Sequence, residues 1–295
     1  MMLRQLRDTG ADAEAVRSVA DAAFAPDAEG ARDASDASDV SDAARTGGFL
    51  RRVRHLTVTD PLGCWLAEDD AGRPVGAALT SRREGLWGLS LLVVAPDAQG
   101  KGVGTELLRR ALDYGRGTLR GIICATARPV AARLFRGAGF TLHPTMRMAG
   151  AVDPAGLPLP DGPAIEGGAR QQDLMDSVDR QVRGGAHGPD HAELLRHYRL
   201  VVADDLAGSG YCYLDDRGRV RLLAATSRRI ATRLLTSALL SAPAAVTTRL
   251  RHLTANQEWA IDVGLAAGLD LTPDGYLCLR AMRPPTPYVP SPTFL

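Results

Sequence analysis

The sequence is poor in lysine, aromatic residues and net charge, and these shortages exclude several classes of protein. Lys101 is the only lysine, and the 35 Lys and Arg residues are balanced by 34 Asp and Glu residues, for a net charge of +1. A protein with this balance lacks the excess of positive charge that is typical of proteins that bind nucleic acid or a membrane surface. No apolar run reaches the roughly 18 residues of a membrane span, and the N-terminus lacks an apolar signal core. We therefore expect a cytoplasmic protein that binds neither nucleic acid nor membrane.

Cysteine and histidine are also scarce, and their spacing does not predict a metal site. The cysteines are far apart, without the C-x-x-C spacing of zinc or dithiol sites, and no histidine lies near Cys124 in sequence. His187 and His191 are four residues apart, but Gly188-Pro189 between them prevents a regular helical pair. The sequence thus predicts no metal and four buried, reduced thiols, which are Cys64, Cys124, Cys212 and Cys278.

The length and the apolar content indicate two globular domains. With 295 residues, 45% of them apolar, the chain exceeds one ordinary domain and can bury two cores. Residues 150–163 contain four prolines and three glycines, which is typical of a linker. We expect a first domain over residues 1–150, a linker over 151–163 and a second domain over 164–295.

The first domain alternates helical and strand patterns, which predicts a mixed α/β fold. The exception is the acid-rich, Asp-Ala-Ser-like stretch 27–42, which has little to bury and is expected to form a mobile, solvated loop. Alternatively, the same acids would attract a cationic ligand to that surface. The predicted strands cover 3–7, 63–68, 74–82, 86–94, 121–125 and 142–149, and the predicted helices cover 12–24, 48–58, 103–114 and 129–139.

The second half repeats the first in register. Residues 104–112 align with 231–239 at an offset of 127, and Ala131 and Gly139 align with Ala260 and Gly268 at an offset of 129. Two anchors with so little drift indicate a duplication, and hence two domains of the same kind.

The segment 92–105, LVVAPDAQGKGVGT, is the one that carries chemistry. An apolar strand leads into a glycine-rich turn that opens a helix, where unpaired N–H groups and the helix dipole favour an anion and the glycines let a pyrophosphate approach the backbone. Lys101 adds a positive charge. A Walker loop does not fit, because Lys101 is followed by Gly102. A dinucleotide fold is disfavoured because the turn follows four strands, mostly joined as hairpins. A plain tight turn before a helix stays open.

The spacing Gln99-x-x-Gly102-x-Gly104, after a strand that ends in V-x-P, resembles the acyl-CoA site of the GCN5-related N-acetyltransferases (GNAT). The stretch 131–140, AARLFRGAGF, resembles the A-x-x-L-Y-x-x-x-G-F helix of the same family. The resemblance covers most of residues 1–150 and implies two tandem GNAT-like domains, each with a mostly antiparallel sheet flanked by helices. It also implies that the strand end splays from its neighbour, binds the pantetheine arm and polarises the thioester carbonyl, while the turn holds the pyrophosphate of acetyl-CoA. The implied cofactor-binding residues are Leu92, Val93, Val94, Gln99, Gly100, Lys101, Gly102, Val103, Gly104 and Thr105.

The chain departs from the family pattern at its catalytic positions. Phe135 stands where a tyrosine often protonates the departing thiolate, and Arg128 stands where an asparagine that helps to bind the cofactor is common. A water or a tyrosine of the second half, Tyr211, Tyr213 or Tyr276, is the expected replacement for the acid. The candidates for the general base are Glu84, which can equally be a turn residue facing water, and the C-terminal carboxylate of Leu295, because the tail of some tandem relatives enters the active site.

The aligned turn of the second half has lost its glycines, since Gly100, Gly102 and Gly104 correspond to Ser227, Arg229 and Ala231. We expect the second domain to keep the fold, to bind no CoA, and to complete the sheet, wall the acceptor pocket or mediate homodimerisation. The resemblance implies an N-acetyltransferase that transfers an acetyl group from acetyl-CoA to a primary amine of a small molecule by direct attack in a ternary complex. A non-catalytic acyl-CoA-binding or regulatory module is the alternative, and the acyl length stays open.

Overall fold

The computed structural model describes residues 1–30, 42–243 and 246–295. Its contacts divide the chain into two compact units. The first unit comprises Met1–Arg82 and Trp87–Thr118, and the second unit comprises Arg83–Leu86 and Leu119–Leu295. The tip of one hairpin, residues 83–86, therefore packs with the second unit, although the rest of that hairpin belongs to the first.

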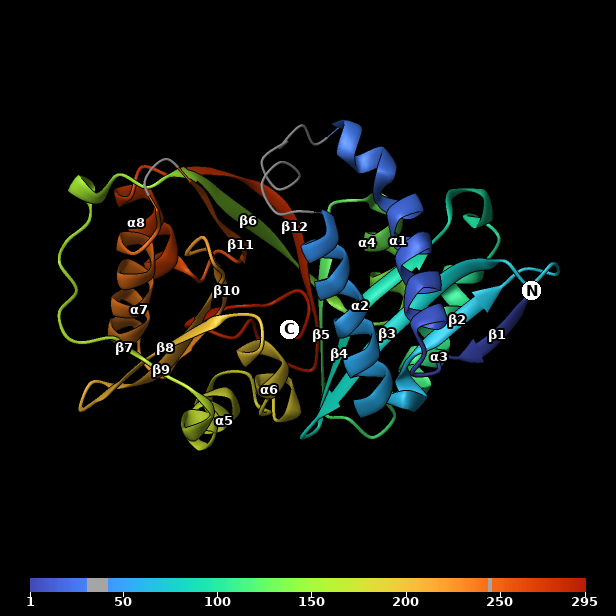
Figure 1. The fold of residues 1–295 in the computed structure, drawn as a ribbon, viewed down its shortest axis with the longest axis horizontal. Helices are drawn as coiled ribbons and strands as arrows, with labels where there is room; N and C mark the ends of the chain where they lie inside the picture. Colours follow the sequence, from blue (N-terminus) through green and yellow to red (C-terminus); the bar gives the residue numbers. More distant parts are fainter. Residues whose placement is uncertain (31–41, 244–245) are drawn as a thin grey trace. The chain divides into compact units, whose positions relative to one another are not determined.

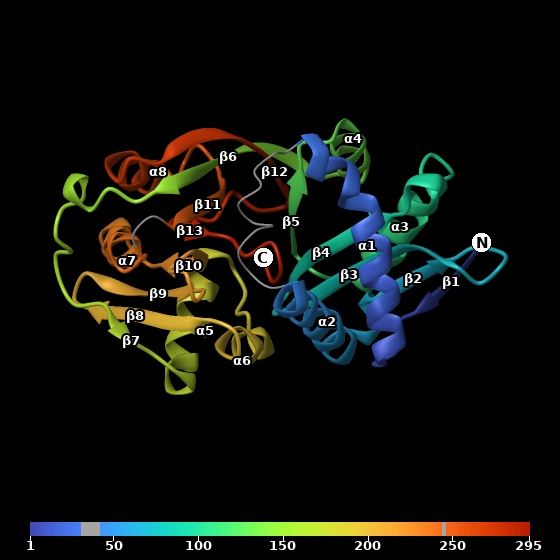
Figure 2. The same ribbon diagram turned by 45° about the horizontal axis from the view of Figure 1, so that its top comes forward.

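The first unit is a sheet with helices on both faces. Its strands follow the order β1 (Met2–Gln5), β2 (Trp65–Glu68), β3 (Pro74–Arg83) and β4 (Leu86–Val94). Figures 1 and 2 show two helices, α1 (Gly10–Gly30) and α2 (Asp42–Thr59), on one face of this sheet and α3 (Val103–Tyr114) on the other. This arrangement places the glycine-rich turn between β4 and α3.

Helix α3 is held on the sheet by an apolar face and by one buried indole. Val103, Leu107 and Ala111 are buried at helical spacing, and the fully buried Trp87 donates from its Nε1 to the carbonyl of Ala111 at 3.1 Å. A Cβ on Gly115, just past the helix, would lie 2.7 Å from the Trp87 ring. Only glycine therefore fits where α3 ends.

The second unit contains two antiparallel sets of strands. One set follows the order β5 (Arg120–Thr126), β12 (Asp270–Arg280), β6 (Thr141–Ala151) and β11 (Thr247–Leu253). The other follows the order β13 (Tyr288–Val289), β10 (Val220–Ala225), β9 (Gly208–Leu214), β8 (Arg199–Asp205) and β7 (Ile165–Glu166). The helices are α4 (Pro129–Gly137), α5 (Gln172–Val182), α6 (Pro189–Leu195), α7 (Arg228–Leu240) and α8 (Glu258–Ala266).

Strand β9 separates a hydrophobic core from a polar one. Cys212 and Leu214 lie in the apolar cluster that includes α7, whereas Tyr211 and Tyr213 point the other way, toward α5 and α6. Residues that alternate along a strand face opposite sides of the sheet. Figure 2 shows α7 and α5 on the two sides of β8–β10.

The predicted repeat is visible in the helices. Helices α4 and α8 begin and end 129 residues apart, and Gly139 and Gly268, which follow them, have φ values of +87° and +76°. Glycine adopts this left-handed conformation after a helix without a steric penalty. However, β6 pairs with β11 and β12, so strands from both halves of the sequence share one sheet. The predicted boundaries at residues 150 and 164 are those of the sequence repeat. The two compact units are defined by contacts instead, so they do not test these boundaries, which stay a prediction.

The predicted loop 27–42 is wrong at both of its ends, which are helical. Residues 27–30 continue α1 and residue 42 begins α2, while 31–41 lie outside the described residues, so the predicted mobility concerns residues that the structure does not describe. Alanine-rich sequence extends a helix readily even where acids interrupt it. Among the described helices, none has both the length and the apolar character needed to cross a membrane.

Candidate functional site

The glycine-rich turn forms an open loop at the N-terminus of α3. After β4 the chain makes a short 3-10 turn, Pro96–Ala98, and then passes through Gly100 and Gly102 with φ values of +75° and +83°. The Gln99 side chain donates from its Nε2 to the carbonyl of Val94 at 3.0 Å, which ties the turn to the end of the strand. A Cβ on Gly100 or Gly102 would meet nothing within 4 Å. The glycines are therefore required for the backbone conformation, and the space beside them is free for a ligand.

The start of α3 offers backbone donors to that space. Gly102 is the N-cap residue and has no side chain to cap the helix, and the first helical bond runs from the Glu106 N–H to the Gly102 carbonyl at 3.0 Å. The N–H groups of the first helical turn lie before that bond and have no acceptor within a helix. Together with the helix dipole and the exposed Lys101, they form a site that suits a phosphate group.

The second copy lacks this arrangement. Residues 95–102 separate β4 from α3, whereas only residues 226–227 separate β10 from α7. The N-cap of α7 is Ser227, whose side chain accepts from the Ile230 N–H at 3.3 Å. The serine side chain thus accepts from a backbone N–H at the start of the helix, whereas the N-cap glycine of the first copy has no side chain to do so. Arg229 lies inside α7 and pairs with Asp161. These features agree with the expectation that the second copy does not bind CoA.

Glu84 lies in the β3–β4 turn, within the second unit, and accepts hydrogen bonds from other residues of that unit. Its φ is +46°, and its carboxylate accepts from Arg180, with 2.7 Å between Nη2 and Oε1, and from the Ala186 N–H at 3.0 Å. These hydrogen bonds, that of Arg180 above all, hold the pKa of Glu84 below its usual value. A Cβ on Gly185 would lie 2.9 Å from the carbonyl of Arg83, so the segment that holds Glu84 fits closely around the turn. A carboxylate held in this way is ionised at neutral pH but is a weak proton acceptor.

The C-terminal residue, Leu295, is the other candidate for the general base. The Leu295 side chain is fully buried, in a cluster with Leu86, Ile122 on β5, and Leu277 and Leu279 on β12, so the end of the tail is anchored on this sheet.

Phe135 is buried in α4 and contributes no donor. Of the three candidate tyrosines, Tyr211 and Tyr213 are fully buried, and burial raises the pKa of both. Tyr276 is partly exposed, on β12 opposite Ala125 of β5. It is the only one of the three that is not fully buried.

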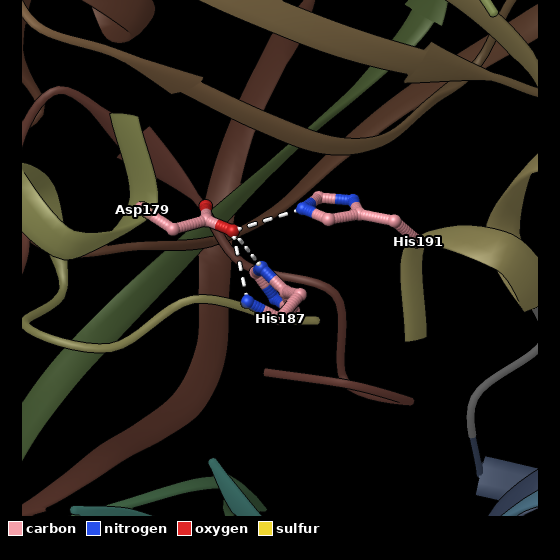
Figure 3. A group of neighbouring side chains, drawn as sticks. All are labelled: Asp179, His187 and His191. Atoms are coloured by element: carbon pink, nitrogen blue, oxygen red, sulfur yellow. Dashed lines mark hydrogen bonds and ion pairs between the residues drawn. The ribbon is translucent and has the colours of Figure 1, made fainter. Parts of the chain in front are cut away.

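A buried polar network around Asp179 was not predicted. Asp179 Oδ2 lies 2.7 Å from His187 Nδ1 and 3.1 Å from His191 Nε2, and it accepts from the His187 N–H at 3.0 Å (Figure 3). Tyr211 donates its O–H to the other oxygen, Oδ1. All four side chains are fully buried, so each donor has replaced a water that the carboxylate has lost.

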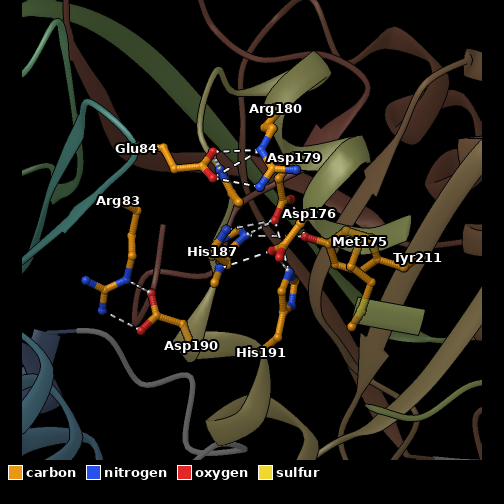
Figure 4. A network of polar contacts seen from close by, with 12 residues as sticks. Arg83, Glu84, Met175, Asp176, Asp179, Arg180, His187, Asp190, His191 and Tyr211 are labelled. Atoms are coloured by element: carbon orange, nitrogen blue, oxygen red, sulfur yellow. Dashed lines mark hydrogen bonds and ion pairs between the residues drawn. The ribbon is translucent and has the colours of Figure 1, made fainter. Parts of the chain in front are cut away.

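The network continues outward to the hairpin tip. His191 Nδ1 lies 3.1 Å from the hydroxyl of Tyr213. On the other side of α6, Arg83 forms a buried two-point ion pair with Asp190, with Nη2–Oδ1 and Nε–Oδ2 distances of 2.7 and 2.9 Å (Figure 4). The tip of the β3–β4 hairpin is thereby fastened to the polar core of the second unit.

The protonation states follow from burial. Burial, together with the charge of Arg183, lowers the pKa of His187 to about 4, so its imidazole is neutral at pH 7. Burial alone would raise the pKa of Asp179, but its interactions with His187 and His191 lower it. An ionised carboxylate thus accepts from the neutral ring of His187, which fixes the proton of that ring on Nδ1 and leaves its Nε2 as an acceptor.

These three residues are of the types that bind a metal, and their ligand atoms lie within 4.8 Å of one another. In the structure they form a hydrogen-bonded group, and a metal would have to displace protons from both rings. Gly188-Pro189 does keep the histidines out of a common helix, since Pro189 begins α6. The turn instead brings both rings to Asp179, one turn from the end of α5, and no sequence motif indicated that. The predicted absence of a metal stays a prediction.

Comparison with known proteins finds a family match in the first half of the chain. A sequence model described as the acetyltransferase (GNAT) family matches residues 33–140, which include the glycine-rich turn and α4. This is the family that the motifs of the first half resemble. No curated protein matches the chain.

Solved structures match nearly the whole chain. A protein of Pyrococcus horikoshii described as an acetyltransferase is 17% identical, with a TM-score of 0.71 over 96% of this chain and 89% of that one. A GCN5-related N-acetyltransferase from Sphaerobacter thermophilus is 17% identical, with a TM-score of 0.57 over 95% of both chains. A tandem GNAT protein from the clavulanic acid biosynthesis pathway is 15% identical, with a TM-score of 0.56 over 96% of this chain and 99% of that one. At these identities the likeness concerns the fold, and it confirms the predicted tandem GNAT architecture of mixed α/β class.

Proposed function

We propose that this protein transfers an acetyl group from acetyl-CoA to a primary amine of a small molecule, by direct attack in a ternary complex. The observation that supports it best is the open N-terminus of α3, where Gly100 and Gly102 keep the approach to the backbone donors clear. The family match covers this turn.

The residues of the turn fit a pyrophosphate. The N–H groups of residues 100–105 and the charge of Lys101 would bind it, and Gln99 would keep the turn against the strand end through its bond to Val94. The backbone at Leu92–Val94 would bind the pantetheine arm and polarise the thioester carbonyl. Acetyl-CoA supplies the acetyl group as a thioester, which a neutral amine can attack. No metal takes part in the proposed reaction.

The proton transfers are assigned to the second unit. Glu84 is the proposed base that receives the proton of the amine, and its pairing with Arg180 makes it a weak one. The carboxylate of Leu295 is the alternative base, supported by the anchoring of that residue against Ile122 of β5. Tyr276 is the proposed acid for the departing thiolate, because it is the one of the three candidates that is not fully buried. General acid–base help of this kind contributes about 10²- to 10⁴-fold.

A non-catalytic acyl-CoA-binding module is the second candidate function. It is favoured by one specific observation, namely that Phe135 replaces the usual acid and is itself buried. Such a module needs only the turn and the strand end, and would bind acetyl-CoA without releasing free thiol in the presence of any amine.

Two measurements test the proposal. Calorimetric titration with acetyl-CoA is expected to show saturable binding in the wild type, and a free-thiol assay over a panel of small primary amines is expected to show turnover. Binding without turnover over the whole panel would support the binding module instead. A wild-type protein that does not bind acetyl-CoA would contradict both functions.

A further inference from the structure

The second unit contains a buried arginine whose charge has no anionic partner among the described residues. The Arg183 side chain is 3% exposed, and its Nε and Nη1 atoms are buried without a hydrogen-bond partner. A buried guanidinium is costly unless it is paired, because it has lost its water. Arg183 stands at the end of α5, where the chain turns toward α6.

The carboxylates around Arg183 are already in use. Asp179 accepts from His187, His191 and Tyr211. Asp190 pairs with Arg83, and Glu84 pairs with Arg180. Asp190 and Glu84 therefore each balance another arginine, and the oxygens of Asp179 are occupied by donors other than Arg183.

Arg183 also lines a cavity with a strongly basic wall. The cavity has a volume of about 330 Å³ and is formed by the end of α5 and by residues 282–286 of the tail. Among the described residues that line it, Arg120, Arg180, Arg183 and Arg283 are basic and none is acidic. Among the residues that the structure describes, the one carboxylate paired with these arginines is that of Glu84, on Arg180. Positive charges this close together repel one another, and an anion bound between them would offset the repulsion.

Two more buried polar atoms in this region have no partner. They are His187 Nε2 and the Tyr288 hydroxyl, and the charge of Arg183 influences the pKa of both groups. Groups of this kind in a native protein commonly indicate a bound water, ion or ligand. The Tyr288 hydroxyl can donate to an anion, whereas His187 Nε2 is an acceptor and needs a donor such as water.

We infer that the cavity beside Arg183 binds a small anion through a carboxylate or phosphate group. Arginine suits such groups because its planar N–H donors match their oxygens. The site is distinct from the glycine-rich turn and does not depend on the proposed acetyl transfer, since its lining residues all belong to the second unit.

Thermal unfolding and calorimetry of the full chain test this site. The probes are inorganic phosphate and succinate, each compared with sodium chloride at the same ionic strength. Either probe is expected to stabilise the wild type in a saturable way that chloride does not reproduce, and the better of the two identifies the preferred group. Equal responses to chloride and to both probes would overturn the inference, because they would show only general screening.

Variants assign the effect to Arg183. Arg183→Gln is expected to weaken the binding of the effective probe at least tenfold, and Arg183→Lys to weaken it less, because the charge is kept. Arg196→Gln is the matched control, since this arginine is 71% exposed and pairs with Glu193 outside the cavity. Unchanged binding in Arg183→Gln would refute the site.

The stability without an anion gives a further readout. Because the charge has no partner, Arg183→Gln is expected to unfold at the same or a higher temperature than the wild type in a buffer free of phosphate and carboxylate. A large decrease would mean that the guanidinium is paired within the fold, against the inference. If the variant cannot be produced, Arg283→Gln at the exposed side of the cavity decides, with binding expected to weaken about threefold and unchanged binding counting against the site.

Discussion

Replacing Gly102 by glutamate is the sharpest test of the acetyl-CoA site. The substitution puts a carboxylate at the N-cap of α3, where the proposed pyrophosphate binds. A Cβ at this position meets nothing within 4 Å, so the side chain fits without disturbing its neighbours. The backbone is the only source of strain, because φ is +83° and a residue other than glycine costs roughly 1 kcal/mol there.

The expected loss of binding follows from the added charge. Two like charges roughly 5 Å apart near a protein surface repel by about 3 kcal/mol. Salt and solvent reduce this in an exposed turn to about 2 kcal/mol, which corresponds to roughly thirtyfold in the dissociation constant. Calorimetric titration with acetyl-CoA at low and at high salt measures this value, and the effect is expected to shrink as the salt concentration rises.

Gly117→Glu is the matched control. Gly117 has a φ of +82°, is exposed, and also has nothing within 4 Å of its Cβ position, but it follows α3 instead of preceding it. Both variants are expected to lose about 1 kcal/mol of stability in urea unfolding, and only Gly102→Glu is expected to lose affinity. If both variants bound acetyl-CoA like the wild type, or weakened to the same extent, the turn would not be the phosphate site.

The remaining predictions concern the second unit. Glu84→Gln is expected to lower kcat about tenfold, below the usual range for a base because Arg180 already weakens it; an unchanged kcat removes Glu84 from the mechanism. Tyr276→Phe is expected to lower kcat about 100-fold with little change in KM, and equal rates would leave the acid role to water. Asp190→Asn removes the charge that pairs with the buried Arg83 and is expected to cost about 3–5 kcal/mol in urea unfolding, whereas a loss below 1 kcal/mol would show that water reaches the pair. His187 has its pKa lowered to about 4 by burial, so the unfolded state binds more protons between the two pKa values: stability is complete above about pH 6.5 and falls, by up to about 1.4 kcal/mol per pH unit, as the pH drops toward 4. His187→Gln should remove this part of the slope, and a slope unchanged by the substitution would contradict it.

Much of the first unit could be predicted because its signals are local. The positions of Gly100 and Gly102 specify a left-handed turn by themselves, and the apolar spacing of 103–114 specifies a helix that begins where the structure has it. The offset of 129 between Gly139 and Gly268 likewise depends on residues that end a helix whatever surrounds them.

The polar core of the second unit could not be predicted, because its partners come from separate elements. Asp179, His187 and Tyr211 lie on α5, on the following turn and on β9, and no periodicity relates them. The sequence showed that His187 and His191 do not share a helix, but not that the turn between α5 and α6 directs both rings to one carboxylate. The basic cavity beside Arg183 could not be predicted for the same reason, since its other wall is formed by residues 282–286, about 100 positions later in the sequence.

The hairpin tip 83–86 restricts how the gene for this protein can be divided. Arg83 and Glu84 belong by contact to the second unit and by sequence to the first half. A fragment that starts after residue 118 therefore lacks the arginine that pairs with Asp190, and a fragment that ends there lacks Asp190. Loss of either half, or its exchange for another domain, would break this salt bridge. We therefore expect the ion pair to favour inheritance of the two halves as a single unit.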